Sequence, residues 1–380
     1  MKEKKEIGKK EECISEYREK GREKGSKRIV KGIMVMVMMV VMGCNSGGVK
    51  GEGTGGGDGR GLSGAMMEVG RSAENAFYAF MGLIADTLGF TAKATTKKSE
   101  VGEYFSSLGA KLGEASAELE AVARKSEGEG SKDKPIALSI RSAVEVAKGV
   151  LSTLKGHLDF LKGIGDSSLV GEVKSDNKQG VAANTDVLKK VHHALTGIIK
   201  AAKTEGIEDL KESKLTLGQA SIGGTNPENG AKVLATSANA TEGDSGKAAA
   251  IVSAVSGEEI LESIVKSGEE KAVQIGAAAT AETTPLEFAV GGTAANLAKE
   301  AAKAAAVAGG IALRALVKEG KLAAHNGNSD EKAVQSAGVT AANKLLVAVE
   351  DVIKKIVKNV LGKVKQEVDK ARESKTVGQQ

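Results

Sequence analysis

Apolar residues recur at steps of three and four along most of the chain after residue 72, and this spacing limits the fold more than any other feature. Residues three or four apart share one face of an α-helix, so such a stripe marks the side that packs against a core. Aromatic residues make up 2% of the chain, and few β-branched residues alternate in twos, so strand signals are weak. The pattern predicts an all-α fold. The clearest stripe contains Ile136, Ile140, Val144, Ala147, Leu151, Leu154, Leu158 and Leu161.

Helix boundaries follow from proline, glycine and capping residues. Pro135 suits the first turn of a helix, where its missing N–H costs nothing, and Gly163 ends the same helix. Asn184 and Thr185 are good N-caps, and Gly206 closes the helix that follows them. We expect longer helices over about 72–88, 101–124, 135–161, 185–205, 296–324 and 334–372, and short helical pieces over 248–285.

Gly309 and Gly310 interrupt the stretch 296–324, which is otherwise rich in Ala and Leu, the strongest helix formers. Two glycines inside a helix cost roughly 2 kcal/mol relative to two alanines. Simple tolerance of this cost is one interpretation. We favour close contact with another helix, because a residue without a side chain lets two backbones approach each other.

The run Ile33–Met42 contains ten uncharged apolar residues and is followed at once by Gly43 and Cys44. Ten helical residues reach about 15 Å, half of the ~30 Å hydrocarbon core of a bilayer, so the run is too short to span a membrane. Three basic residues within 27–31 precede it, which gives the charge-then-apolar order of a secretory signal. The alternative is a buried apolar helix that happens to contain a cysteine.

The junction at Cys44 resembles the lipobox of bacterial lipoproteins, with a small residue before the cysteine and Val41 three places before it. The resemblance implies cleavage before Cys44, lipidation of its sulfur and acylation of its new amino group. The segment that follows is about half glycine and is typical of a flexible tether. We predict a lipoprotein signal peptide over 1–43, a Gly-rich tether over 44–64 and a surface domain over 65–380.

The charge and the cysteines agree with removal of the first segment. Residues 1–32 contain 12 Lys and Arg and 7 Glu, so they carry the whole formal net charge of +5. This stretch is long for the basic region of a signal peptide, which leaves a translation start nearer Ile29 open. The rest of the chain is neutral and gives no evidence for nucleic-acid binding. With Cys13 removed and Cys44 lipidated, the mature chain has no thiol for a disulfide or a metal site.

No arrangement of residues for catalysis or metal binding emerges from the sequence. The four histidines lack the i, i+4 pair that places two imidazoles on one helix face, and we expect edge-of-core packing for them. No G-x-S-x-G elbow occurs, and the carboxylates alternate with lysines as on a solvated helix face. We therefore predict no enzyme activity, no metal and no cofactor. The histidines are His157, His192, His193 and His325.

Two further segments favour a structural interpretation. The segment Gly243–Ala248 faintly resembles a phosphate loop but lacks the first glycine and the Ser or Thr that holds Mg²⁺, so a capped helix start explains it better. Lysines between 354 and 365 on the last helix could contact anionic lipid or host polyanions. Acidic residues between 350 and 369 dilute that field, so we favour a solvated face.

Several long and idiosyncratic segments resemble the variable large proteins, which are variable major surface lipoproteins of relapsing-fever spirochaetes. The chain is more distantly similar to the variable surface antigen of Lyme spirochaetes. The resemblance covers nearly everything after Cys44, and the long amino-terminal extension departs from it. The segments that carry it are 89–116, 140–166, 230–237, 303–324 and 339–361.

The resemblance implies a mostly helical domain on the outer surface, held in the outer membrane by acylated Cys44. It implies a role in antigenic variation, with host antibodies as partners. Exposed loops on a helical frame can change nearly freely, because surface substitutions usually alter stability by only about ±0.5 kcal/mol. An adhesin or host-ligand receptor is the alternative function, and it would need a surface patch or groove.

We expect these helices to form an elongated bundle. The last helix is long and needs a long partner, so the helix predicted near 72–88 is expected to pack beside it. This arrangement would bring both chain ends to the membrane-proximal base and leave the polar loops mainly at the distal end. The loops expected to be antibody targets lie near 126–134, 166–180, 221–230, 238–246 and 325–332.

Overall fold

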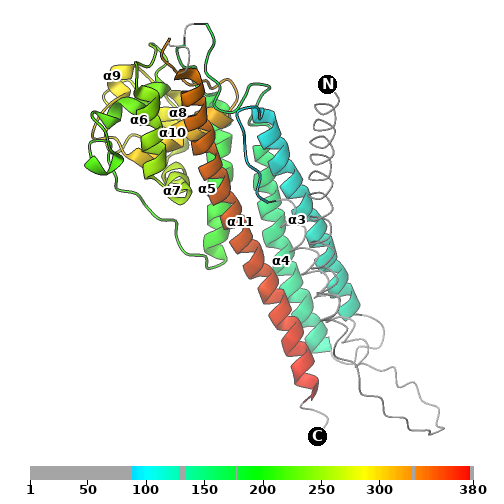
Figure 1. Ribbon diagram of the computed structural model, residues 1–380. Coiled ribbons are helices and arrows are strands. Elements are labelled where there is room, and N and C mark those ends of the chain that lie inside the picture. The colour runs from blue at the N-terminus through cyan, green and yellow to red at the C-terminus, as the bar shows by residue number, and fades with distance from the viewer. Residues whose placement is uncertain (1–87, 128–133, 177, 327–329, 377–380) are drawn as a thin grey trace, which may run out of the picture. The chain divides into compact units, whose positions relative to one another are not determined.

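The computed structural model describes residues 88–127, 134–176, 178–326 and 330–376, and these residues are mostly helical (Figure 1). Isolated β-bridges link extended segments in these ranges, which contain no strand, so the all-α prediction is confirmed. The long helices are α3 (Lys98–Ser126), α4 (Lys134–Leu161), α5 (Thr185–Thr204) and α11 (Asp330–Thr376). The short helices are η1 (Ala220–Ile222), η2 (Pro227–Leu234), α6 (Asp244–Ala254), α7 (Gly257–Val265), η3 (Glu269–Lys271), α8 (Pro285–Val290), α9 (Ala294–Leu297) and α10 (Ala304–Leu316).

Helix α4 packs against α3, α5 and α11 (Figure 1). The stripe predicted for it is confirmed, because its members from Ile140 to Leu161 are at most 1% exposed. At the edge of the α3–α4 contact, Glu120 accepts hydrogen bonds from Arg141 at 2.9 Å and Lys148 at 2.6 Å. The bonds from Lys148 and Arg141 lower the pKa of Glu120 to about 2. Burial of the stripe supplies the main attraction between the helices, and the partly buried ion pairs add a smaller contribution at the edge of the contact.

Helix α5 begins and ends where its capping residues predict. The side chain of Asn184 accepts a hydrogen bond from the backbone N–H of Val187 at 3.1 Å, which satisfies one free donor of the first turn. Gly206 follows the helix with φ of +75°, a conformation that glycine adopts without strain. The apolar face between these ends packs on α4 and α11.

Helix α11 has 47 residues and is about 70 Å long at 1.5 Å per residue. Its first half contacts α6, α7 and α10, and it also contacts α4 and α5. Its apolar residues at steps of three and four from Leu345 to Val368 are at most 4% exposed, as the helix predicted over about 334–372 requires. The helix predicted over 72–88 lies almost wholly outside the described residues. Immediately after it, the backbone N–H of Gly89 donates to Glu350 of α11 at 3.0 Å.

The short helices gather around α10, and we call residues 220–316 the head. All thirteen residues of α10 are buried, and the helix contacts α6, α7, α8 and α11. A Cβ atom on Gly310 would lie 2.3 Å from Cβ of Phe288, and one on Gly309 would lie 3.0 Å from Cβ of Pro285. The expected close helix contact at these glycines is therefore confirmed, with α8 as the partner.

The prediction of one continuous helix over 296–324 is wrong. Two separate helices lie in this region: α9 covers Ala294–Leu297, and α10 covers Ala304–Leu316. The residues on both sides of α10 instead exchange backbone hydrogen bonds with loops, such as Lys321 N–H to Val181 O at 3.0 Å and Ala304 N–H to Leu215 O at 2.8 Å. These bonds satisfy buried backbone groups of two segments at once, which outweighs the helix propensity of the alanines.

The predicted signal peptide, the tether and most of the first predicted helix lie outside the described residues. Within the described part of the chain, none of the helices combines the length and the apolar character needed to cross a membrane.

Candidate functional site

The lipidation site predicted at Cys44 lies outside the described residues, and it stays a prediction. The other predicted functional features are surface loops and grooves. The structure describes most residues of the five predicted loops, and it shows which of them lie together.

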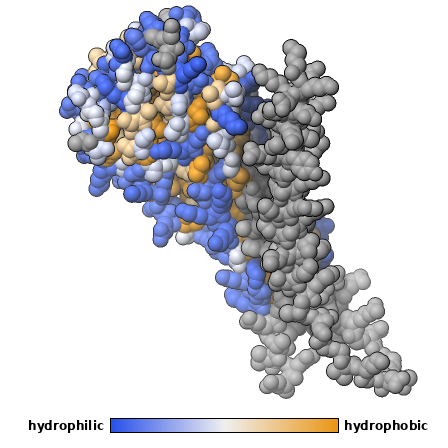
Figure 2. All heavy atoms as spheres, viewed as in Figure 1, coloured by the Kyte–Doolittle hydropathy of each residue, from blue (hydrophilic) through white to orange (hydrophobic). Residues whose placement is uncertain are grey.

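Three of the predicted loops meet near the amino-terminal end of α11, and we call residues 166–180, 238–246 and 325–332 the loop face. The side chain of Asn239 donates to Asn326 at 2.9 Å, which joins the second loop to the third. Lys178 of the first loop forms an ion pair with Glu331 of the third. Figure 2 shows hydrophilic side chains over much of this end of the head. Segments distant in the sequence therefore form one polar surface.

The remaining two predicted loops, 221–230 and 126–134, do not belong to the loop face. The range 221–230 is partly helical, since η1 and η2 flank Gly223 and Gly224, whose φ values are +85° and +80°. Of the range 126–134 the structure describes Ser126, Glu127 and Lys134, and Lys134 begins α4 near the carboxyl-terminal part of α11. Ser139 of α4 donates to Glu367 of α11 at 2.6 Å, which fixes this placement.

Lys98 is a buried lysine that binds backbone carbonyls near the loop face. The Lys98 ammonium group, at the start of α3, donates to the carbonyls of Arg314 at 3.2 Å, Val317 at 2.8 Å and Gly320 at 2.5 Å. These oxygens lie at and beyond the carboxyl end of α10, where a helix carries partial negative charge. Burial lowers the pKa of Lys98 to about 8, although nearby Asp166 and Glu172 partly oppose this effect. The side chain thus joins α3 to the centre of the head.

Arg314, which lies within the head, also donates to backbone carbonyls at helix ends. Its guanidinium is completely buried and donates to Ala289 O at 2.8 Å, Leu234 O at 2.8 Å and Phe288 O at 3.2 Å. These carbonyls end α8 and η2. Burial lowers the pKa of Arg314, but the group is still charged at neutral pH. One side chain therefore holds two helix ends against α10.

Lys344 of α11 caps a third helix in the same way. Its ammonium group donates to Val252 O at 2.7 Å, Ser253 O at 3.3 Å and Val255 O at 2.6 Å, at the carboxyl end of α6. Burial lowers the pKa of this lysine. Lys98, Arg314 and Lys344 were not among the residues predicted to have a role. The one signal available was Arg314, the single charge within the apolar run 304–316.

The histidines show the expected edge-of-core packing in part. His192 is buried, and the ring of His157 lies so near Gly197 that a Cβ there would be 2.1 Å from Cε1. The side chain of His193 is instead 60% exposed and lies 3.5 Å from Glu269. The described residues hold no group of three or more His, Cys, Asp and Glu side chains placed to bind a metal ion.

The segment Gly243–Ala248 is a helix start, as predicted. Gly243 is the N-cap of α6, with φ of +81°. The buried carboxylate of Asp244 accepts from the backbone N–H and the hydroxyl of Thr241, at 2.7 and 2.6 Å. A carboxylate in this position repels a phosphate group.

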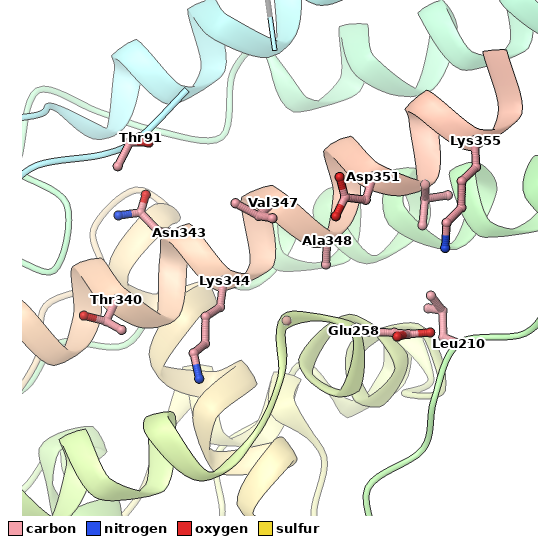
Figure 3. Close-up of a pocket in the computed structure, with 12 residues that line it drawn as sticks. Thr91, Leu210, Glu258, Thr340, Asn343, Lys344, Val347, Ala348, Asp351 and Lys355 are labelled. Carbon is pink, nitrogen blue, oxygen red and sulfur yellow. The ribbon is translucent and has the colours of Figure 1, made fainter. Parts of the chain in front are cut away.

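A groove of about 490 Å³ lies between α7 and α11 (Figure 3). Val347 and Ala348 form an apolar side of it, and Asp351 and Lys355 add opposite charges farther along α11. Glu258 lies across the groove from them and accepts from the backbone N–H of Lys211 at 3.0 Å. The groove offers space and both signs of charge for part of a ligand.

Comparisons with known proteins identify what the chain resembles. A family model described as Borrelia lipoprotein matches residues 73–368. Variable large protein 25 of Borrelia hermsii is 62% identical over 84% of this chain and 88% of its own length. Variable large protein 12 of the same organism is 27% identical over 83% of this chain and 85% of its own length. The crystal structure of the Lyme disease variable surface antigen VlsE of Borrelia burgdorferi is 26% identical, with a TM-score of 0.64, over 80% of this chain and 97% of that one.

Proposed function

The chain belongs to the Borrelia lipoprotein family, and from this premise we propose that it is an outer-surface lipoprotein whose exposed loops vary to evade host antibodies. Its relatives are named as variable large proteins and a variable surface antigen, and none of those printed names denotes an enzyme. We propose in the same way that this chain has no catalytic role.

This proposal rests on one observation: the polar loops of the loop face lie together on a set of helices with a buried core. The frame beneath it is held by a buried core and by contacts to backbone carbonyls, such as those that Lys98 and Arg314 make. Such contacts do not depend on which side chains the loops present to solvent. Relatives from 26% to 62% identical cover at least four fifths of the chain, so the family tolerates wide sequence change.

We propose that acylated Cys44 anchors the chain and that the carboxyl-terminal end of α11 faces the membrane. The helix predicted over 72–88 would be about 25 Å long, and it leads into Gly89 beside Glu350. That length suffices to run back along α11 toward its carboxyl-terminal end. Two or more acyl chains give stable anchoring, since one chain binds a membrane only marginally.

The anchor is tested by Cys44→Ala in the native bacterium. The variant should leave the membrane fraction and lose the lipid mass, because no acyl chain then holds the chain to the bilayer. Cys13→Ala is the matched control, since it removes a thiol from the segment predicted to be cleaved. Full membrane retention of Cys44→Ala, or an unmodified Cys44 in mass spectra of the native protein, would refute the proposal.

Exposure of the loop face is tested with antibodies against the folded protein. Exchange of the exposed residues of 238–246 for those of a relative, with Gly243 and the buried Ala240, Asp244 and Ser245 kept, should abolish recognition by part of the serum and leave thermal stability unchanged. Antibodies that bind intact bacteria but map only to the apolar helix stripes would reject this assignment.

The groove between α7 and α11 favours host-ligand binding as a second candidate function. A ligand that binds there would contact Val347, whose side chain is half exposed, and the charges of Asp351 and Lys355. Binding of a purified host plasma or matrix protein that Val347→Glu abolishes and Val273→Glu preserves would support it. Equal binding by both variants would exclude the groove.

A further inference from the structure

His157 of α4 packs its ring directly against Gly197 of α5. A Cβ atom on Gly197 would lie 2.1 Å from Cε1, 2.3 Å from Nε2 and 2.5 Å from Nδ1 of that ring. These distances are far shorter than van der Waals contact, so only a residue without a side chain leaves room for the ring. The histidine and the glycine therefore form one matched contact between the two helices.

The ring of His157 lies at one end of a hollow of about 670 Å³ between α4 and α5. His193 lines the same end, and Glu145 lines the other end, about 18 Å away along α4 at 1.5 Å per residue. The apolar and small residues that line the hollow are Val146, Gly149, Val150, Gly197 and Ala201. A movement of the ring away from Gly197 would extend this hollow.

The place of the ring suits a neutral imidazole and not a charged one. Nδ1 of His157 is shielded from solvent and has no hydrogen-bond partner among the described residues. In a neutral imidazole this nitrogen can be the one without a proton, but an imidazolium carries an N–H on both nitrogens. The second N–H would be buried without an acceptor, which costs free energy. Burial, with a smaller contribution from nearby His193, lowers the pKa of His157.

The groups that face His157 from neighbouring elements do not offset a positive charge on it. His193 and Lys200 of α5 line the same hollow, and both are bases. Glu269 of η3 lies 3.5 Å from Nδ1 of His193 and 3.9 Å from Nδ1 of His192, so it is placed to pair with these two histidines.

The carboxylates on the other sides of α4 have partners of their own. Asp159 pairs with Lys155 at 2.6 Å, and both lie beside α3. Glu145 pairs with two basic residues of its own helix. On α11, the buried carboxylate of Glu350 accepts from Tyr104 of α3 at 2.5 Å. A proton on this imidazole would therefore be a charge without a counter-charge beside it.

We propose that His157 is an acid-sensitive latch between α4 and α5: its neutral ring rests on Gly197 and closes one end of the hollow, and protonation releases the ring and opens the hollow. The released ring exposes both N–H groups to water, which removes the cost of burying them. The open form binds the proton more tightly, so the latch is closed at neutral pH and is lost as pH falls below about 6.5. The latch depends neither on the proposed anchor nor on antibody evasion.

Titration of the histidines by NMR tests whether protonation moves the ring. The chain has four histidines, all among the described residues, so selective isotope labelling of histidine gives few signals. In the full-length mature protein in mild detergent, the pKa of His157 should lie below its ordinary value of 6.5. The backbone amide of Gly197 should shift with the same midpoint, because the ring leaves it at that step.

Two glycines of the hollow provide a matched pair of variants. In Gly197→Ala the new Cβ displaces the ring at every pH, so the pKa of His157 should rise toward its ordinary value. Gly149→Ala adds a Cβ to the same hollow with no atom within 4 Å of it, and it should leave the titration of His157 unchanged.

Hydrogen exchange measures the opening itself. Protection factors over 152–160, corrected for the intrinsic pH dependence of exchange, should fall at least about fivefold from about pH 7.5 to about pH 5.5, since one proton allows up to about tenfold per pH unit. His157→Gln removes the titrating group and should abolish this fall. His325→Gln, at a histidine in the loop face, is the control and should behave like the wild type. Circular dichroism checks that both variants fold.

Three results would overturn the proposal. They are a Gly197 amide that does not follow the titration of His157, equal titration of His157 in the two alanine variants, and an equal loss of protection in wild type and His157→Gln. The first would mean that the ring accepts its proton in place. If His157→Gln does not fold, the two glycine variants still decide.

Discussion

Three buried or half-buried cations among the described residues lie at the carboxyl ends of helices. Lys98, Arg314 and Lys344 each donate to three main-chain carbonyls at or just beyond a helix end, where the carbonyls lack partners within the helix. The partial negative charge of a helix end offsets part of the cost of burying a cation. These contacts connect α3, α10 and α11 to the short helices of the head.

Arg314→Leu should strongly destabilise the protein. The change leaves the carbonyls of Leu234, Phe288 and Ala289 buried without their donors, and each unsatisfied group costs about 1–3 kcal/mol. We expect a loss of at least about 3 kcal/mol in the free energy of unfolding by urea. Arg124→Leu, at a side chain that is 76% exposed, should change it by less than about 1 kcal/mol. Similar losses for both variants would contradict this role of Arg314.

Lys98 should make stability depend on pH above neutrality. Its folded-state pKa of about 8 lies below its ordinary 10.5, so the unfolded chain binds this proton more tightly. The contribution of Lys98 to the free energy of unfolding therefore rises as pH increases from about 8 to about 10.5, by roughly 2–3 kcal/mol. Lys98→Met removes the group and should remove this rise. Parallel stability curves of wild type and Lys98→Met between pH 7 and 10 would contradict the prediction.

The buried roles of these three residues could not be predicted from the sequence. Lys98 lies in a polar stretch that looks like an ordinary helix start, and its partners are more than 200 positions away. Arg314 was visible as a lone charge in an apolar run, but its partners were not. The acceptors are backbone carbonyls, which every residue type carries, so the sequence holds no mark of them.

Helices with a regular apolar stripe were predictable, and those with uniform composition were not. α4, α5 and α11 bury one face and leave another in water, so their spacing revealed them. α10 is buried on all sides, and alanine-rich sequence continues beyond both its ends. Its limits are set by hydrogen bonds to loops distant in the sequence, and no local pattern records those bonds.

The contact of α10 with α8 should make Gly310 intolerant of a side chain. A Cβ in Gly310→Ala would meet Phe288 at 2.3 Å, which forces the helices apart and should cost about 1–3 kcal/mol by thermal unfolding. Gly362→Ala on α11 is the matched control, because no atom lies within 4 Å of a Cβ there. That change should stabilise the protein by about 0.5–1 kcal/mol. Equal effects would show that the glycines of α10 serve no packing purpose.

At the scale of the whole described unit, α11 separates two kinds of surface. The loop face lies at its amino-terminal end, and the first turns of α4 lie near its carboxyl-terminal end. The composition of these loops made their exposure predictable, but their grouping depends on helix directions that one sequence does not reveal. The groove beside Val347 was hidden for the same reason, since its walls come from distant segments.

The placement of loops at opposite ends of α11 predicts which of them antibodies reach on intact bacteria. A short epitope tag inserted within 325–332 should be labelled on live cells, because that loop belongs to the face turned away from the proposed anchor. The same tag inserted within 126–134 should be labelled weakly until detergent removes the membrane, since its flanking helices end near the carboxyl-terminal part of α11. Both loops are polar and both insertions leave the core intact, so thermal unfolding should not differ between them. Equal labelling on live cells, or stronger labelling of the 126–134 insertion, would mean that the chain is anchored in another orientation.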